Sequence, residues 1–84
     1  MTALEVYEAF FDSANDYNGL LADCGGDMVK AIQAYADGAF DIALTSEAAE
    51  AIAKAGEQFR AYDGYELSQK YWEFVEKPLG EMEV

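Results

Sequence analysis

Four segments of this chain repeat apolar side chains at the spacing of an α-helix, and each starts at or just after a residue that caps helices well. The segments predict helices over residues 2–17, 28–36, 47–62 and 65–77. Side-chain oxygens can accept hydrogen bonds from the free backbone amides at a helix start. The capping candidates are Thr2, Asp27, Thr45 or Ser46, and Asp63. Short connections between amphipathic helices favour an all-α fold, a compact bundle of about four short helices.

The connections between these helices contain turn signals. Asn18–Gly19 should end the first helix and Gly38 the second, because asparagine and glycine tolerate the left-handed backbone at a helix end. Leu20 and Leu21 are then expected to reach the core from a loop. Residues 39–45 alternate apolar and polar side chains without a second strand to pair with, so we expect an extended linker, with helix as the alternative.

A chain of 84 residues forms one domain, which we assign to residues 1–84. Pro78 should end the last helix, and residues 79–84 are expected to form a frayed tail. With 52% hydrophobic and 14% aromatic residues, the chain can build a core. The helical faces assign these large side chains, among others, to it: Val6, Tyr7, Phe10, Ile32, Tyr35, Ile52, Phe59, Leu67, Tyr71, Phe74 and Val75.

The charge of the chain is strongly negative. It has 17 Asp and Glu residues and 5 Lys and Arg residues, which give a formal net charge of −12. Nucleic acids and anionic membranes repel such a chain at long range, so neither is expected to bind it directly. We expect the partner to present a basic surface, such as that of a nucleic-acid-binding protein or complex.

The acidic residues of the first predicted helix have no basic neighbour. Elsewhere, each basic residue lies three or four positions after an acid, as Lys54 does after Glu50, which is typical of solvated helix faces. Residues 1–29 contain no Lys or Arg, and four acids share one stripe opposite the apolar face: Glu5, Glu8, Asp12 and Asp16. Each like-charge neighbour on a helix costs about 0.2–0.5 kcal/mol. This uncompensated repulsion is the strongest functional signal in the sequence.

The stripe has a spacing that suits a row of cation sites. Residues three or four apart rise about 4.5–6 Å along a helix, so the carboxylates can occupy several positions in a groove built for nucleic-acid phosphates. The alternative interpretation is that the stripe is the solvated face of an acidic protein.

Residues that usually carry catalysis or hold cofactors are missing. The chain has no histidine, the commonest general base and metal ligand, and no glycine-rich nucleotide loop. Cys24 is the one cysteine, so no internal disulfide can form, and a buried structural thiol is expected, with a reactive thiol as the alternative. The N-terminus lacks the pattern of a signal peptide. We therefore expect a cytoplasmic protein that is not an enzyme and uses no cofactor or metal.

In charge, length and its acidic first helix, the chain resembles the small acidic proteins of phages and mobile elements that mimic DNA. The resemblance implies an inhibitor of antirestriction or anti-CRISPR type that occupies the basic groove of its target in the host cytoplasm. It rests on no family motif, so the candidate residues come from the pattern alone. Besides the four acids of the stripe, they are the loop acids Asp23 and Asp27 and the edge aromatics Tyr65 and Trp72.

Two other classes of function fit the sequence. One is a non-catalytic adaptor or antitoxin-like subunit that docks on a protein through Tyr65 and Trp72. The other is a structural protein that assembles with copies of itself. Salt separates the adaptor from the DNA mimic, because screening weakens charge-driven binding far more than binding through aromatic side chains.

Overall fold

The helical pattern is realised as an all-α fold in a computed structural model of the chain. The structure describes the backbone of residues 1–12, 14–60 and 71–84, and the side chains of 1–12, 18–57 and 71–84. Its elements are α1 (Ala3–Asp12), α2 (Ala14–Asp23), α3 (Met28–Phe40), α4 (Ser46–Arg60), the π-helix η2 (Trp72–Glu76) and α6 (Lys77–Gly80). Within the described backbone, pairing of the β type is limited to one isolated bridge. The predicted fold class is therefore confirmed.

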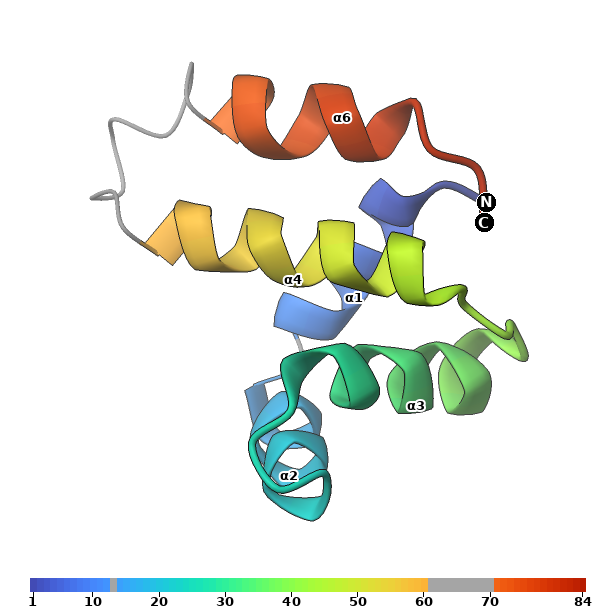
Figure 1. Cartoon of the computed structure of the whole chain (residues 1–84), viewed down its shortest axis with the longest axis vertical. Coiled ribbons are helices and arrows are strands. Elements are labelled where there is room, and N and C mark those ends of the chain that lie inside the picture. Colours follow the sequence, from blue (N-terminus) through green and yellow to red (C-terminus); the bar gives the residue numbers. More distant parts are fainter. Residues whose placement is uncertain (13, 61–70) are drawn as a thin grey trace.

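Helix α4 lies at the centre of the arrangement. It packs against α3 on one side and η2 on another, while α1 crosses it and also contacts α6 (Figure 1). Helix α2 contacts α1 and α3 at the opposite end of the molecule from α6. The radius of gyration is 12.1 Å, close to the value of about 11.8 Å expected for a folded chain of this length.

The core is built from the apolar faces that the periodicity predicted. Its fully buried side chains come from α1, α3, α4 and η2: Ala3, Val6, Phe10, Ala31, Ile32, Ala36, Ala49, Ile52 and Val75. The predicted core side chains of Phe59 and Leu67 lie outside the described residues. Alanines dominate the buried face of α4, so neighbouring helices can approach its backbone closely.

Gly56 allows α1 to lie close against α4. A Cβ atom at this position would lie 2.9 and 3.0 Å from Cε2 and Cε1 of the Phe11 ring, and closer still to Cζ. A glycine inside a helix is about 1 kcal/mol less favourable than an alanine. The approach of the Phe11 ring explains why glycine occupies this position.

Capping side chains start α3 and α4 at the predicted places. Asp27 Oδ1 accepts a hydrogen bond from the Lys30 amide at 3.2 Å. Thr45 Oγ1 accepts one from the Ala48 amide at 3.1 Å, so Thr45 is the cap of α4. The predicted cap Asp63 lies outside the described residues.

The predicted extent of the first helix was wrong. α1 ends at Asp12, and α2 runs through Asn18–Gly19, the pair expected to end a helix. α2 ends before Gly25–Gly26, whose positive φ angles of 67° and 85° supply the left-handed exit. Leu20 and Leu21 therefore pack against the core from a helix instead of a loop. Their burial outweighs the local preference of Asn18–Gly19 for a turn.

The predicted end of α3 was also wrong. The helix continues through Gly38 to Phe40, and Asp41 takes the left-handed conformation, with φ of 56°. Its amide donates to the carbonyl of Asp37 at 3.2 Å. The longer helix lets the Phe40 ring pack edge-on against Tyr35, with centroids 6.0 Å apart. This contact within α3 favours a helix that continues past the glycine.

The linker between α3 and α4 is confirmed over residues 41–45, because α3 takes the first two residues of the predicted range 39–45. Leu44 is buried, and Ile42 is partly buried against the core. The Gln33 side-chain amide donates to the carbonyl of Leu44 at 3.1 Å. The linker is therefore held down by apolar side chains and by a hydrogen bond from α3.

The last helix was predicted to end at Pro78, but it continues to Gly80. The helix widens ahead of the proline, where the Lys77 amide donates to the carbonyl of Trp72, five residues back. Proline has no N–H, and its ring crowds the carbonyl four residues earlier in a regular α-helix. The wider π turn accommodates both properties.

The predicted frayed tail at residues 79–84 was wrong. Leu79 is buried, with 1% of its surface exposed. The carbonyl of Met82 accepts a hydrogen bond from the Ala3 amide at 2.8 Å, and the Val84 amide donates to the carbonyl of Met1 at 3.0 Å. The tail therefore runs beside the N-terminus, and the two chain ends meet (Figure 1). Backbone pairing across 80 residues of sequence could not be read from local composition.

Candidate partner-binding surface

Helix α1 presents acids on one side and packs the core with the other. Glu5, Glu8 and Asp12 are exposed, while the apolar side of the same helix is buried. Glu5 has a structural role as well, because its Oε1 accepts a hydrogen bond from the Thr2 amide at 3.3 Å, and its own amide donates to Thr2 Oγ1 at 3.4 Å. This reciprocal capping box accounts for Glu5. Glu8 and Asp12 have no such explanation in the fold.

The fourth acid of the predicted stripe, Asp16, belongs to α2, an element separate from α1. The prediction that one helix carries all four acids was therefore wrong. The side chain of Asp16 lies outside the described residues, so the row described on α1 consists of Glu5, Glu8 and Asp12.

In the structure, acids of α1 and of η2 lie near Tyr71, the residue that precedes η2. The pKa of Tyr71 is raised above its usual value by burial first, and then by the negative charges of Glu8, Glu76 and Asp12. The Tyr71 ring also lies 6.4 Å from that of Tyr7 on α1, centroid to centroid. We call Glu8, Asp12, Tyr71 and Glu76 the Tyr71 cluster. Its three carboxylates are exposed, and its phenol stays protonated at neutral pH.

Trp72 follows Tyr71 directly and faces solvent. Its side chain is 49% exposed, and Lys77 Nζ lies 5.4 Å from the centroid of its ring. A cation over an aromatic face is a favourable arrangement. Trp72 is thus an exposed aromatic residue beside the Tyr71 cluster. Tyr65, the other predicted edge aromatic, lies outside the described residues.

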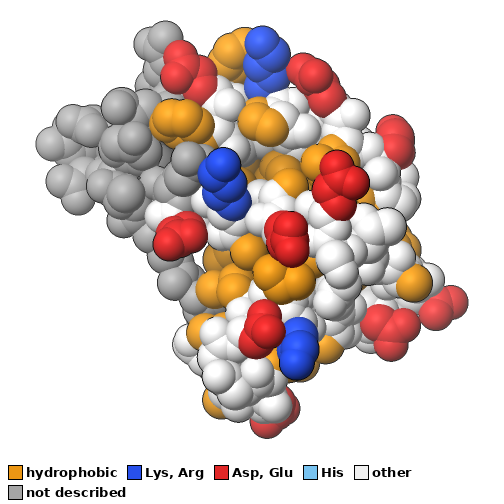
Figure 2. Space-filling model, in the orientation of Figure 1, with side chains coloured by type: hydrophobic (Ala, Val, Ile, Leu, Met, Phe, Trp, Pro, Cys, Tyr) orange, Lys and Arg blue, Asp and Glu red, His pale blue; other side chains and the backbone are white. Residues whose placement is uncertain are grey.

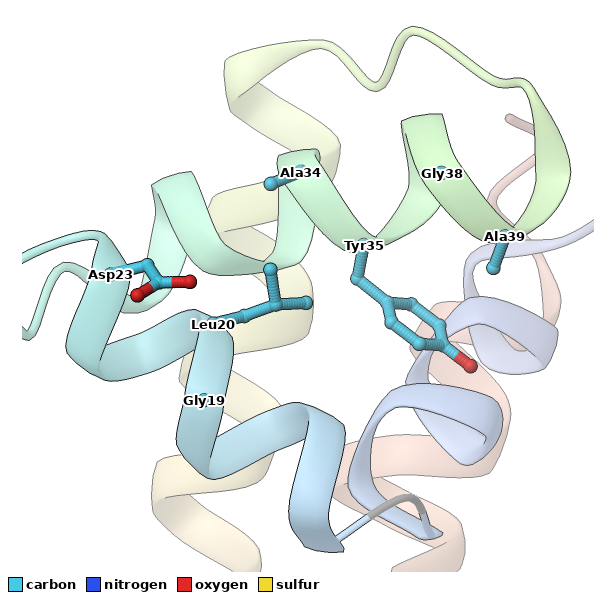
Figure 3. A pocket seen from close by; sticks show the side chains of 7 residues that line it. All are labelled: Gly19, Leu20, Asp23, Ala34, Tyr35, Gly38 and Ala39. Atoms are coloured by element: carbon cyan, nitrogen blue, oxygen red, sulfur yellow. The ribbon is translucent and has the colours of Figure 1, made fainter.

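Asp23 and Asp27 lie at the end of α2 and the start of α3. Both are exposed. Asp27 is accounted for by its capping bond to the amide of Lys30. Asp23 closes α2 and lines a groove between α2 and α3 (Figure 3). Since α2 lies far from the C-terminal helix in Figure 1, these two acids do not join the Tyr71 cluster.

Negative charge is spread broadly over the described residues. Every Asp and Glu whose side chain is described is exposed, and acids are scattered across the described part of the face visible in Figure 2. The predicted pair Glu50–Lys54 does not form; the ion pair between described residues joins the Met1 amino group and Glu83, at 3.5 Å. The described carboxylates therefore face solvent, where a cationic partner can reach them.

The sequence pointed to Glu8 and Asp12 but missed Tyr71 and Glu76. Glu76 lies four residues after Trp72, so helical spacing could have placed it near that residue. Its approach to α1 depends on packing between segments more than sixty residues apart, which no local pattern encodes.

Neither a metal-binding group of side chains nor a membrane-spanning helix occurs in the described ranges. No group of three or more His, Cys, Asp and Glu side chains there is placed to hold a metal ion. None of the helices in those ranges is long and apolar enough to cross a lipid bilayer. Cys24 is a free thiol, partly buried against the core.

No protein-family model, curated protein or solved structure was found to match this chain.

Proposed function

We propose that this protein is a non-catalytic acidic inhibitor that occupies the basic groove of a nucleic-acid-binding protein. The observation that carries the proposal is the Tyr71 cluster, where exposed carboxylates from two distant segments, Glu8 and Asp12 on α1 and Glu76 on η2, lie close enough to Tyr71 to raise the pKa of its phenol. Repulsion between Glu8 and Asp12, four residues apart on α1, opposes folding. A basic partner would relieve it.

Inhibition would follow from occupancy alone. Carboxylates that meet Arg and Lys side chains make charge-assisted hydrogen bonds, and they take the places that nucleic-acid phosphates would fill. The phenol of Tyr71 can accept a hydrogen bond from an arginine N–H. The overall charge of −12 would speed the encounter with a basic groove and repel the competing nucleic acid.

One observation favours a second candidate, the adaptor. Trp72 is 49% exposed, and tryptophan is among the residues that contribute most to protein interfaces. In this reading Trp72 would enter a pocket on the partner, and the acids would only keep the protein in solution. The two candidates differ in their response to salt and to charge reversal.

The test begins by capturing the partner from a lysate of the source cell, at low and at high salt. Binding to that partner is then measured by titration for two doubly substituted variants with equal net charge. One combines Glu8→Lys with Asp12→Lys in the Tyr71 cluster. The control combines Glu47→Lys with Glu50→Lys on the exposed face of α4.

The proposal expects the cluster variant to bind at least about tenfold more weakly than the control variant, because like charges placed against each other at an interface cost several kcal/mol. Wild-type protein should also displace nucleic acid from the partner, and the cluster variant should not. Equal binding by both variants would contradict the proposal. Loss of binding on Trp72→Ser alone, together with insensitivity to salt, would favour the adaptor.

A further inference from the structure

An open groove of about 480 Å³ lies between α2 and α3, away from the Tyr71 cluster. Gly19, Leu20 and Asp23 line it from α2, and Tyr35 and Gly38 line it from α3 (Figure 3). The proposed function does not use this groove. Two of the residues that line it are glycines inside helices.

Gly19 and Gly38 are helix-interior glycines that the fold itself does not require. Neither has a positive φ angle, and a Cβ atom at either position would meet nothing within 4 Å. Gly56 differs, because the Phe11 ring occupies the space beside it. Each glycine costs its helix about 1 kcal/mol relative to alanine. A bare backbone is useful where an external molecule comes close to it, and these two glycines line the same groove from opposite helices.

The other walls define what chemistry would fit. Leu20 packs partly against the core, and the Tyr35 ring is held edge-on by Phe10 and Phe40, at centroid distances of 5.5 and 6.0 Å. These side chains offer a fixed apolar floor. Asp23 places a carboxylate at one end, and its side chain is exposed. A matching ligand has an apolar body and a positive charge.

Charge complementarity selects the class of occupant. A second copy of the chain would bring a further net charge of −12 to the contact, and nucleic acids and anionic membranes are repelled in the same way. A basic amphipathic protein segment has the opposite charge, and a helix can lie close to the bare backbone of Gly19 and Gly38.

We propose that the α2–α3 groove docks a helix of the partner that carries apolar side chains and Arg or Lys. The apolar side chains cover Leu20 and the Tyr35 ring, the helix backbone approaches at Gly19 and Gly38, and the basic side chain pairs with Asp23. This inference rests on the proposed function for the positive charge of the partner. It adds a second contact surface, which would give specificity that charge alone does not supply.

The probe is a synthetic amphipathic peptide of about 14 residues, or roughly four helical turns, with Leu and Ala on one face and Arg at its edges. One control peptide has Gln in place of each Arg, and another has the same charge but no apolar face. Binding is followed through the amide resonances of isotope-labelled protein. The amides of Gly19, Leu20 and Gly38 should shift with the first peptide, and each control should bind at least about tenfold more weakly.

Two leucine substitutions test the groove directly. Gly38→Leu should fill it, leave the helix content and melting temperature at or above the wild-type values, and weaken peptide binding at least tenfold. The matched control is Gly80→Leu, at an exposed glycine outside the groove where a Cβ atom meets only Leu4 Cδ2 at the ordinary distance of 3.8 Å. It should leave peptide binding unchanged. Asp23→Lys, at the C-terminal end of α2, should also weaken binding without unfolding the protein.

The outcomes separate this inference from the proposed function. If the peptide shifts amides near Glu8 and Asp12 and Gly38→Leu binds it like wild type, the groove proposal is overturned and the Tyr71 cluster is supported. If the Gln peptide binds as tightly as the Arg peptide, the cationic occupant is wrong. Unchanged partner binding by the Glu8→Lys, Asp12→Lys variant would count against the proposed function, whatever the groove does.

Discussion

The contact of α1 with α4 and the contact of α2 with α3 use glycine for different purposes. At the first, the ring of Phe11 fills the space over Gly56. At the second, the space over Gly19 and Gly38 is empty, and a groove of about 480 Å³ remains. The backbone cost of a helical glycine is similar in both places. What differs is that a side chain of the same protein fills the space beside Gly56, whereas a Cβ atom at Gly19 or Gly38 would meet nothing within 4 Å.

The acids show the same division. Glu5 and Asp27 make capping hydrogen bonds that stabilise α1 and α3. Glu8, Asp12 and Glu76 lie near Tyr71, where their charges disfavour ionisation of the phenol. Acids that cap a helix and acids that do not therefore occur together on α1. Substitutions at the two kinds of residue should have different effects on stability.

The largest expected effect on stability is at Gly56, where the Phe11 ring fills the space between α1 and α4. Gly56→Ala should lower the free energy of unfolding by about 1–3 kcal/mol, because the new methyl group overlaps the Phe11 ring and the overpacking outweighs the gain in helix propensity. Denaturant titration measures the change. Combining it with Phe11→Leu should recover part of the loss. A Gly56→Ala protein as stable as wild type would remove the packing explanation for this glycine.

The next effect concerns an acid with an internal role. Asp27→Ala should destabilise the protein by about 1 kcal/mol, since the Lys30 amide loses its capping acceptor. Asp27→Asn keeps an acceptor oxygen and should stay within a few tenths of a kcal/mol of wild type. Thermal melts of the two variants suffice. If Asp27→Asn destabilises the protein as much as Asp27→Ala does, the negative charge at this helix start matters more for stability than the hydrogen bond. Asp27 would then again be a candidate for partner binding.

A substitution at Gly38, where the space between α2 and α3 is open, should change the free energy of unfolding in the opposite direction. Gly38→Ala is expected to raise the free energy of unfolding by about 0.5–1 kcal/mol, because alanine favours the helix and its methyl group meets open space. Measured beside Gly56→Ala in the same denaturant series, it gives two glycine-to-alanine changes of opposite sign. A loss of stability at position 38 would mean that the groove is closed by a neighbour in solution.

The smallest effect is confined to alkaline solution. The pKa of Tyr71 is raised by burial and by Glu8, Glu76 and Asp12, so the folded state holds the phenol proton more tightly than the unfolded state. This contribution is fully present below the unfolded pKa of about 10 and is lost as the pH rises through the folded pKa. The stability of wild type relative to Tyr71→Phe should therefore be constant up to about pH 9 and fall above it. If the stability of wild type relative to Tyr71→Phe instead rose with pH, the pKa of Tyr71 would be lowered in the folded state.

Local sequence signals predicted the elements better than their ends. The apolar period located the helices and assigned Val6, Phe10, Ile32 and Ile52 to the core, all of which are fully buried. It did so because the helical period is a property of neighbouring residues. The breaks were harder to locate, since Asn18–Gly19 tolerates a helix when Leu20 and Leu21 can be buried by continuing it.

The candidate surface was predictable in composition but not in shape. The helical class, the capped helix starts and the acids without basic neighbours near the N-terminus all follow from the sequence, because these are local or additive properties. The contacts of the folded chain decide that Asp16 belongs to a helix separate from α1, that Glu76 lies near Tyr71 together with Glu8, and that the tail pairs with the N-terminus. These features depend on contacts between segments far apart in the chain, whose free energies are comparable with the local preferences they override.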